Sequence, residues 1–234
     1  STSMRALDFD QMDRMSAAKA TAKKFIQGRT SDRIGLVVFG GASLLACPPT
    51  MDYEAILDYL DDVEPGMTQT EGTAIGDGIA SAVDHLKSSP AKSKVVVLLT
   101  DGRSNTGAID PVTAAKTLAA LGVKVYAVGT AGRGPALMPV DDPRQGRVMV
   151  QIDDDLDEEL LAEIARLTGG KSYRAQNRGE LARIFAEIDS LEKSGVKRPA
   201  VVAVADWHAP PLAAAALLLL FESALAATAL LRWP

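Results

Sequence analysis

The stretch KVVVLLTDG, residues 94–102, contains an apolar run from Val95 to Leu99 that ends in Thr100, Asp101 and Gly102. A short β-branched run without polar alternation is typical of a strand buried on both faces of a parallel sheet. Open α/β sheets bind their ligands at the carboxyl ends of such strands. We therefore expect Asp101 at the mouth of a sheet crevice, on a turn that Gly102 allows. A helix-capping role in a βα loop is the alternative for Asp101.

Strands and helices alternate on both sides of this stretch. Apolar runs at Ile34–Phe39 and Val123–Val128 predict two more buried strands, which should be parallel neighbours of Val95–Leu99. Ala42–Cys47 predicts a short edge strand that ends at two prolines, and Arg133–Met149 predicts a loop or hairpin. A further short strand is expected at 171–174, and helices at 13–27, 52–63, 73–86, 110–122, 156–167 and 179–191. This order predicts an α/β fold, with an open, mostly parallel, Rossmann-like sheet flanked by helices on both faces.

Composition narrows the possible functions of the chain. Its 234 residues are 47% hydrophobic and carry a formal net charge of -5, so there is enough material for a core but no basic footprint for nucleic acid. The single cysteine, Cys47, cannot form an internal disulfide and is predicted to pack as a small apolar side chain. The sequence has neither a phosphate-binding loop nor a Gly-x-Gly-x-x-Gly turn, and its two histidines supply few zinc ligands.

The composition changes near the carboxyl end of the chain. Leu212–Leu231 is almost entirely apolar, contains one charge at Glu222, and has about the length of 20 residues that a bilayer core requires. With Trp207 and Trp233 as interface anchors, it predicts a transmembrane helix after a linker at 195–211 and a soluble domain at 1–194. A charge inside the membrane usually faces a partner or a cavity, so Glu222 suggests association with other membrane helices. A buried helix of the soluble domain is the alternative.

Four oxygen-bearing side chains come from three predicted loops. Ser1 and Ser3 lie at the amino end, Thr73 opens a helix, and Asp101 follows the central strand. Hydroxyl and carboxylate oxygens are the ligands that suit Mg²⁺ or Mn²⁺. Each residue also has a structural explanation, since serine and threonine are favoured at helix starts. The acidic run Asp153–Asp155 is better explained as charge that complements a helix dipole than as a cation site.

This pattern resembles the von Willebrand factor A (VWA) domain and its metal-ion-dependent adhesion site (MIDAS). The family pattern is Asp-x-Ser-x-Ser, then Thr, then Asp, and Ser1-Thr2-Ser3 matches the Ser-x-Ser half. The resemblance implies that Ser1, Ser3, Thr73 and Asp101 are metal ligands. It also implies a first metal Asp two residues before Ser1. A first strand would lie between the strands at 34–39 and 95–99. The chain is therefore expected to lack the amino-terminal part of the domain, and its structure to show a gap or a distorted closure between these two strands.

A narrower resemblance covers nearly the whole chain. The bacterial aerotolerance (Bat-type) membrane proteins are similar at residues 32–53, 72–79, 98–111 and 156–175 and in a terminal helix that ends in Arg232-Trp233-Pro234. Those proteins carry one or two membrane helices before the domain and one after it, and they are encoded beside MoxR-type AAA+ ATPases.

The Bat-type resemblance implies a membrane-anchored interaction module that is not an enzyme. It would bind a carboxylate of a protein partner through the metal and serve stress resistance or complex assembly. Other VWA membrane proteins and a MoxR-type ATPase system are implied partners. It places the domain on the outer side of the bacterial inner membrane, whereas Lys193, Lys197 and Arg198 before the helix favour the cytoplasm. The alternatives are a metal-dependent hydrolase that uses Asp101, or a structural membrane subunit with a vestigial metal site.

Overall fold

The computed structural model describes residues 1–10, 12–89, 91, 93–142, 144, 146–153, 155–195, 215 and 217–225. The chain divides into two compact units, Ser1–Val196 and Lys197–Pro234. The described elements of the first unit are η1 (Thr2–Arg5), α1 (Arg14–Gln27), β1 (Ile34–Phe39), β2 (Ser43–Thr50), α2 (Tyr53–Asp62), α3 (Ile75–Leu86), β3 (Lys94–Thr100), α4 (Pro111–Ala120), β4 (Val123–Thr130), β5 (Ala136–Asp142), β6 (Gly146–Ile152), α5 (Glu158–Thr168), β7 (Ser172–Ala175) and α6 (Arg178–Gly195).

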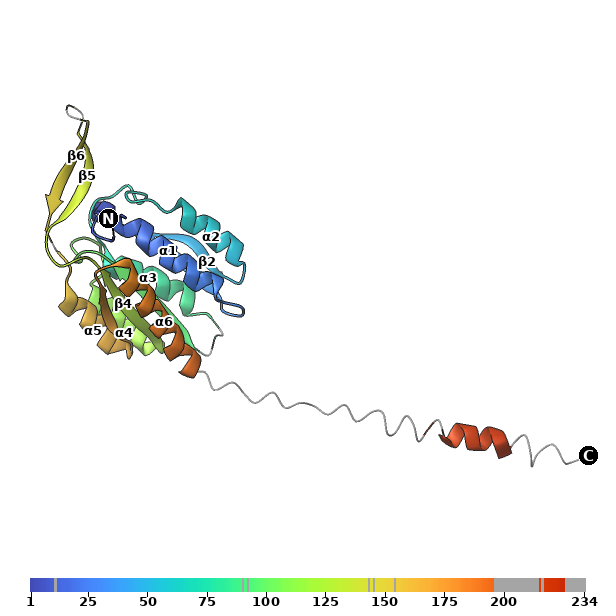
Figure 1. Cartoon of the computed structure of the whole chain (residues 1–234). Coiled ribbons are helices and arrows are strands. Elements are labelled where there is room, and N and C mark those ends of the chain that lie inside the picture. The colour runs from blue at the N-terminus through green and yellow to red at the C-terminus, as the bar shows by residue number, and fades with distance from the viewer. Residues whose placement is uncertain are drawn as a thin grey trace, which may run out of the picture. The chain divides into compact units, whose positions relative to one another are not determined.

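Three parallel strands form the central sheet, in the order β3-β4-β7 (Figure 1). The β3–β4 register runs from Lys94 opposite Val123 to Thr100 opposite Gly129, so the two carboxyl ends lie level. Asp101 follows β3 directly and therefore lies at the carboxyl edge of the sheet, as predicted.

Helices cover both faces of this sheet, which confirms the predicted layers. Along β4, Val125 and Ala127 join a core cluster with side chains of α3, α4 and α5. Tyr126 and Val128 face the other way and pack with side chains of α1 and α6. Successive residues of a strand point to opposite faces, so β4 contributes to both cores and is the most deeply buried strand of the sheet.

The expected gap between the strand at 34–39 and the strand at 95–99 is present, because β1 does not pair with β3 among the described strands. The expectation that β1 belongs to the same parallel sheet is wrong. In the described part of the chain β1 pairs only with β2, as a separate antiparallel ribbon over α2, where Cys47 is buried with Ile56 and Leu60.

Strand β3 packs on both faces as expected, with Leu98 in one core cluster and Val97 and Leu99 against the other, but only Leu98 and Thr100 are fully buried. Among the described strands β4 is the only partner of β3, so its other edge is less well covered.

Two further elements differ from the expected boundaries or settle an open choice. Strand β2 continues through the two prolines to Thr50, which is tolerated because it is an edge strand with an irregular register to β1. The segment 133–149 contains a hairpin, in which β5 and β6 pair from Ala136–Ile152 to Asp142–Gly146. The hairpin extends away from the sheet beside the amino end of the chain (Figure 1). There the Leu7 amide donates to the Leu137 carbonyl at 2.8 Å.

The second unit contains the predicted transmembrane segment, half of which lies outside the described residues, as do Trp207 and Trp233. Residue 215 and residues 217–225 are helical, and the Ser223 hydroxyl donates to the carbonyl oxygens of Leu219 and Leu220, both at 2.9 Å. Within the part of the chain that is described, no helix combines the length and apolarity that a membrane crossing requires.

Candidate metal centre

Asp101 is the most deeply buried of the predicted site residues. Its side chain is 1% exposed, and its Oδ2 atom accepts a hydrogen bond from Arg14 Nη1 at 3.1 Å. The helix-capping alternative does not hold, because the next helix, α4, is capped by Asp110, whose carboxylate accepts from the Thr113 amide at 2.8 Å. The Asp101 carboxylate is thus not used to cap that helix.

Ser1 and Ser3 approach Asp101 from the amino end of the chain. Their hydroxyl oxygens lie 2.5 Å apart, and the Ser3 side chain is near enough to the Asp101 carboxylate to lower its pKa. The turn after β1 passes close to this segment at Gly40, where the tightest neighbour is the Thr68 side chain. A Cβ atom there would lie 2.5 Å from Thr68 Oγ1 and 3.4 Å from the Ser1 nitrogen.

Thr73 lies in the loop before α3, and its side chain does not cap that helix. Ala74 is the N-cap residue and no side chain caps it. The Thr73 amide donates to Asn105 Oδ1 at 2.8 Å and the Asn105 amide donates to the Thr73 carbonyl at 3.1 Å. These bonds tie the Thr73 loop to the loop after Asp101. A Cβ atom built on Gly102 would lie 4.0 Å from Thr73 Oγ1, so the hydroxyl lies beside the Asp101 turn.

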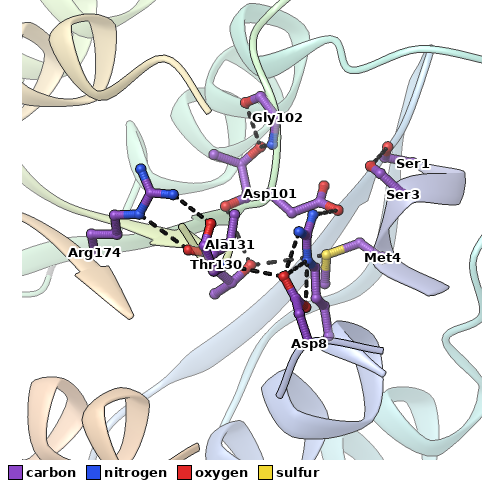
Figure 2. Close-up of polar contacts among 12 residues, drawn as sticks. Ser1, Ser3, Met4, Asp8, Asp101, Gly102, Thr130, Ala131 and Arg174 are labelled. Atoms are coloured by element: carbon purple, nitrogen blue, oxygen red, sulfur yellow. Dashed lines mark hydrogen bonds and ion pairs between the residues drawn. The ribbon is translucent and has the colours of Figure 1, made fainter. Parts of the chain in front are cut away.

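The four predicted residues therefore gather at one edge of the sheet, and the sequence analysis missed two residues that join them. Arg14, 2% exposed, is bound by Asp8 through Nε–Oδ1 at 2.9 Å and Nη2–Oδ2 at 2.6 Å. Figure 2 shows Asp8 and Asp101 on either side of the guanidinium group that joins them. Asp8 is held in turn by the Gly132 amide at 3.0 Å, in the loop after β4.

One feature of the sequence could have pointed to Arg14. It is the first residue of α1, where the helix dipole disfavours a cation. An arginine at this position therefore needs carboxylates nearby, and Asp8 lies six residues earlier in the chain. Spacing alone does not reveal that the side chain turns inward toward Asp101.

Comparison with known proteins identifies the family. The model of the von Willebrand factor type A domain matches residues 1–187. The chain belongs to the VWA domain family. An uncharacterized protein of Borreliella burgdorferi is 32% identical over 205 residues, which cover 87% of this chain and 59% of that protein. The chain thus spans about three fifths of the length of this curated relative.

Two solved structures of Bat-type proteins share this VWA fold. The conserved hypothetical protein BatB from Bacteroides thetaiotaomicron is 28% identical, with a TM-score of 0.71 over 82% of this chain and 95% of that chain. An aerotolerance-related membrane protein from Bacteroides fragilis is also 28% identical, with a TM-score of 0.69 over 81% of this chain and 94% of that chain.

A more distant structure shows the fold alone. Proximal thread matrix protein 1 from the mussel byssus, whose structure has a zinc-occupied MIDAS motif, is 23% identical with a TM-score of 0.57, over 76% of this chain and 42% of that chain.

The electrostatics of the VWA site centre on a buried carboxylate. Burial raises the pKa of Asp101 above its ordinary value. The Ser3 side chain and the positive charge and hydrogen bond of Arg14 lower this pKa but do not fully offset the burial. Because the charged form is poorly stabilised by its surroundings, an additional cation beside Asp101 would be favourable.

The donor set fits a hard divalent cation. Hydroxyl oxygens of Ser1, Ser3 and Thr73 and the carboxylate of Asp101 are oxygen ligands of the kind that Mg²⁺ and Mn²⁺ prefer. Arg14 contacts Oδ2 of Asp101 through a single 3.1 Å hydrogen bond. Among the described residues, no group of three His, Cys, Asp or Glu side chains is spaced to hold a metal, so the softer ligand sets typical of zinc find no support.

The acidic run before α5 does not supply the helix cap. The cap is Asp157, whose carboxylate accepts from the Leu160 amide at 2.9 Å. Asp155 instead pairs with Arg103 Nε at 2.7 Å, on an exposed bridge to the loop that follows Asp101. Arg14 therefore lies closer to the Asp101 carboxylate than Arg103 does, since Arg14 contacts it directly.

Proposed function

We propose that this VWA domain binds Mg²⁺ or Mn²⁺ through Ser1, Ser3, Thr73 and Asp101, and through that ion a carboxylate of a protein partner. The convergence of these four side chains from three loops at the carboxyl edge of the sheet carries the proposal. The zinc in the byssus protein's MIDAS motif supports it, since that protein shares the fold.

The charges around the site explain why the ligand would be an anion. The proposed first shell contains one carboxylate, and the Arg14 guanidinium already contacts that carboxylate. A divalent ion held mainly by neutral hydroxyls keeps most of its positive charge and is therefore electrophilic toward an Asp or Glu side chain of a partner. Asp8 does not add its charge to the shell, because Arg14 and the Gly132 amide hold both of its oxygens.

We further propose that the domain is anchored in the bacterial inner membrane and lies outside the cytoplasm. The apolar composition of Leu212–Leu231, after a linker at 195–211, supports an anchor. The description of the Bacteroides fragilis neighbour as a membrane protein also supports it. Other VWA membrane proteins and a MoxR-type ATPase system are the proposed partners, in stress resistance or complex assembly. A first strand between β1 and β3 stays a prediction.

Titration calorimetry with Mn²⁺ tests the metal site directly. Asp101→Asn should weaken Mn²⁺ binding by about tenfold or more, since it removes the only anionic ligand of the proposed shell. Asp84→Asn is the matched control, because Asp84 is exposed on α3 and pairs with Lys87 at 2.7 Å. Equal Mn²⁺ affinity in the Asp101→Asn protein and the unchanged protein would remove Asp101 from the site and overturn the proposed function.

Membrane partitioning tests the anchor separately. A chain shortened after Ala209 should remain in the aqueous phase, whereas the full chain should require detergent. Circular dichroism of the shortened chain should show an unchanged fold, since the core clusters lie within the first unit. Persistent membrane association of the shortened chain would contradict the anchor.

A further inference from the structure

A recess of about 290 Å³ opens beside the metal centre, at the base of the hairpin. Its walls come from η1, the first turns of α1, the turn after α2, and both strands of the hairpin. The Leu7–Leu137 hydrogen bond fixes the hairpin to the chain segment that follows η1. The recess therefore lies within the ordered part of the domain and shares η1 with the proposed metal site.

Cationic side chains dominate the polar lining of this recess. Arg5, Lys19 and Arg147 line it together with a single carboxylate, Asp13. The surplus of positive charge is notable in a chain whose formal net charge is -5. Charged side chains gathered in a recess attract ligands of the opposite charge, since the surrounding low-dielectric walls focus their field.

The one acidic lining residue is already engaged. Asp13 caps α1, with its carboxylate accepting from the Ser16 amide and the Ser16 hydroxyl, both at 2.7 Å. Lys19 is also fixed, because its Nζ donates to the Asp61 and Val63 carbonyls at 2.7 and 2.9 Å. These are neutral acceptors, so the charge of Lys19 remains uncompensated by an anion.

Arg5 and Arg147 are the side chains available to a ligand. Both are exposed, and no ion pair of either is found among the described side chains. Arg147 stands opposite Asp141 in the hairpin register, so Arg5 is the cation with no acidic residue opposite it. The same face of the hairpin as Arg147 presents Leu137 and Met149, which are 51% and 48% exposed. This wall therefore offers a cation beside apolar surface.

We propose that this recess binds an acidic, extended segment of the protein partner whose carboxylate binds at the metal. The inference rests on the proposed function and adds a second contact region to it. Arg5 lies two residues after Ser3 in η1, about 4 Å along the axis of a 3₁₀ helix. An extended chain advances about 3.3 Å per residue, so a few partner residues span from the metal to the recess. Arg5 and Arg147 bind its acidic side chains, and the hairpin face covers its apolar ones.

Fluorescence anisotropy with a labelled hexaglutamate peptide, in Mg²⁺ and in EDTA, tests this assignment. Arg5→Gln and Arg147→Gln should each weaken binding by about threefold, and the double variant by about tenfold, since exposed ion pairs are individually weak. Hexaserine should not bind. Arg166→Gln is the matched control, because Arg166 is exposed on α5 outside the recess.

The two proposals fail in different ways. Binding that is lost in EDTA or in Asp101→Asn but unchanged in the double arginine variant would overturn the recess and leave the metal function standing. Binding that falls in the double variant but ignores Mg²⁺ would support the recess and overturn the metal function. Absence of hexaglutamate binding in the unchanged protein would overturn the recess. So would capture of phosphatidylglycerol vesicles in place of the peptide, since the cations would then serve a lipid surface.

Discussion

Each end of the central sheet holds a carboxylate beside a cation, Glu192 beside Lys124 and Asp101 beside Arg14, but the pKa values of the two carboxylates are shifted in opposite directions. At the amino end, Glu192 of α6 accepts from Tyr126 at 2.6 Å and from Lys124 and Ser93 at 3.1 Å. Burial on its own would raise the pKa of Glu192, but these hydrogen bonds outweigh it and the pKa is lowered. At the carboxyl end, burial prevails and the pKa of Asp101 is raised.

The difference separates a structural contact from a binding site. The hydrogen bonds of Glu192 stabilise its charge, so this end holds α6 against β4. The charge of Asp101 is incompletely stabilised despite Arg14, so this end gains from a further cation. A carboxylate whose pKa is raised by burial in a loop cluster marks a candidate functional site.

The largest expected effect is at the carboxyl end. Arg14→Met should lower the free energy of unfolding by about 3–5 kcal/mol, because it leaves the carboxylates of Asp8 and Asp101 buried without their partner. Urea unfolding at pH 7 measures this loss, which should shrink as pH falls through the raised folded pKa of Asp101. Arg14→Lys should recover part of the loss. A loss below about 1 kcal/mol would show that Arg14 does not hold this cluster together.

The amino end should respond less to loss of a partner. Tyr126→Phe should cost about 1–2 kcal/mol, since it removes one hydrogen bond to a charged group that water can partly replace. Burial raises the pKa of Tyr126. Its stabilising effect is therefore complete below about pH 10, the value in unfolded chains, and is lost as pH rises through the folded pKa. Urea unfolding between pH 7 and 11 should show the difference between the two proteins narrowing at the alkaline end.

A matched pair of amide variants should show opposite pH dependence. The pKa of Asp101 is raised, so its contribution to stability is present below about pH 3.9 and lost as pH rises through the folded pKa. The pKa of Glu192 is lowered, so its contribution is present above about pH 4.3 and lost as pH falls. As pH rises above about 3.9, Asp101→Asn should gain stability relative to the unchanged protein. Glu192→Gln should lose stability relative to the unchanged protein as pH rises toward about 4.3, and the difference should then stay constant. If the stabilities of the two metal-free variants changed with pH in the same direction, the proposed difference between Asp101 and Glu192 would be wrong.

The smallest effect is expected for Lys124→Gln. Lys124 is 43% exposed where it pairs with Glu192, so solvent screens the interaction. A loss of about 0.2–1 kcal/mol is expected, and added salt should reduce it further. If Lys124→Gln instead lowers the free energy of unfolding as much as Arg14→Met does, solvent exposure does not explain the difference between the Glu192 contacts and the Asp101 contacts.

The parts of the fold that local chemistry determines could be predicted. The continuous apolar runs of β3 and β4 indicated parallel strands, and aspartates before α1, α2 and α4 marked helix starts that the structure confirms. Thr73 and Asp101 were found because one opens a predicted helix and the other follows a predicted strand, and Ser1 and Ser3 because they match the Ser-x-Ser part of the VWA pattern. Their metal binding stays a prediction.

Long-range partners could not be predicted. The pairing of β1 with β2 alone depends on which strands meet in space, and an apolar run in the sequence does not indicate its pairing partner. Arg14 was missed for the same reason, since its Asp101 partner lies 87 residues away. Strand β2 was ended too early because the proline rule distinguishes edge strands from central ones, and edge position is a tertiary property.

The uncovered edge of β3 has a consequence for hydrogen exchange. Successive amides of a strand point to opposite sides, and β3 has a described strand neighbour only on the β4 side. Amide protons that point toward β4 should exchange slowly, and those between them rapidly, so that protection alternates residue by residue from Lys94 to Thr100. At Ala127–Thr130, where β4 lies between β3 and β7, slow exchange should be continuous. The neighbouring strands β3 and β4 would thus differ in the pattern of amide protection along the chain, alternating in β3 and continuous in β4, as well as in its degree.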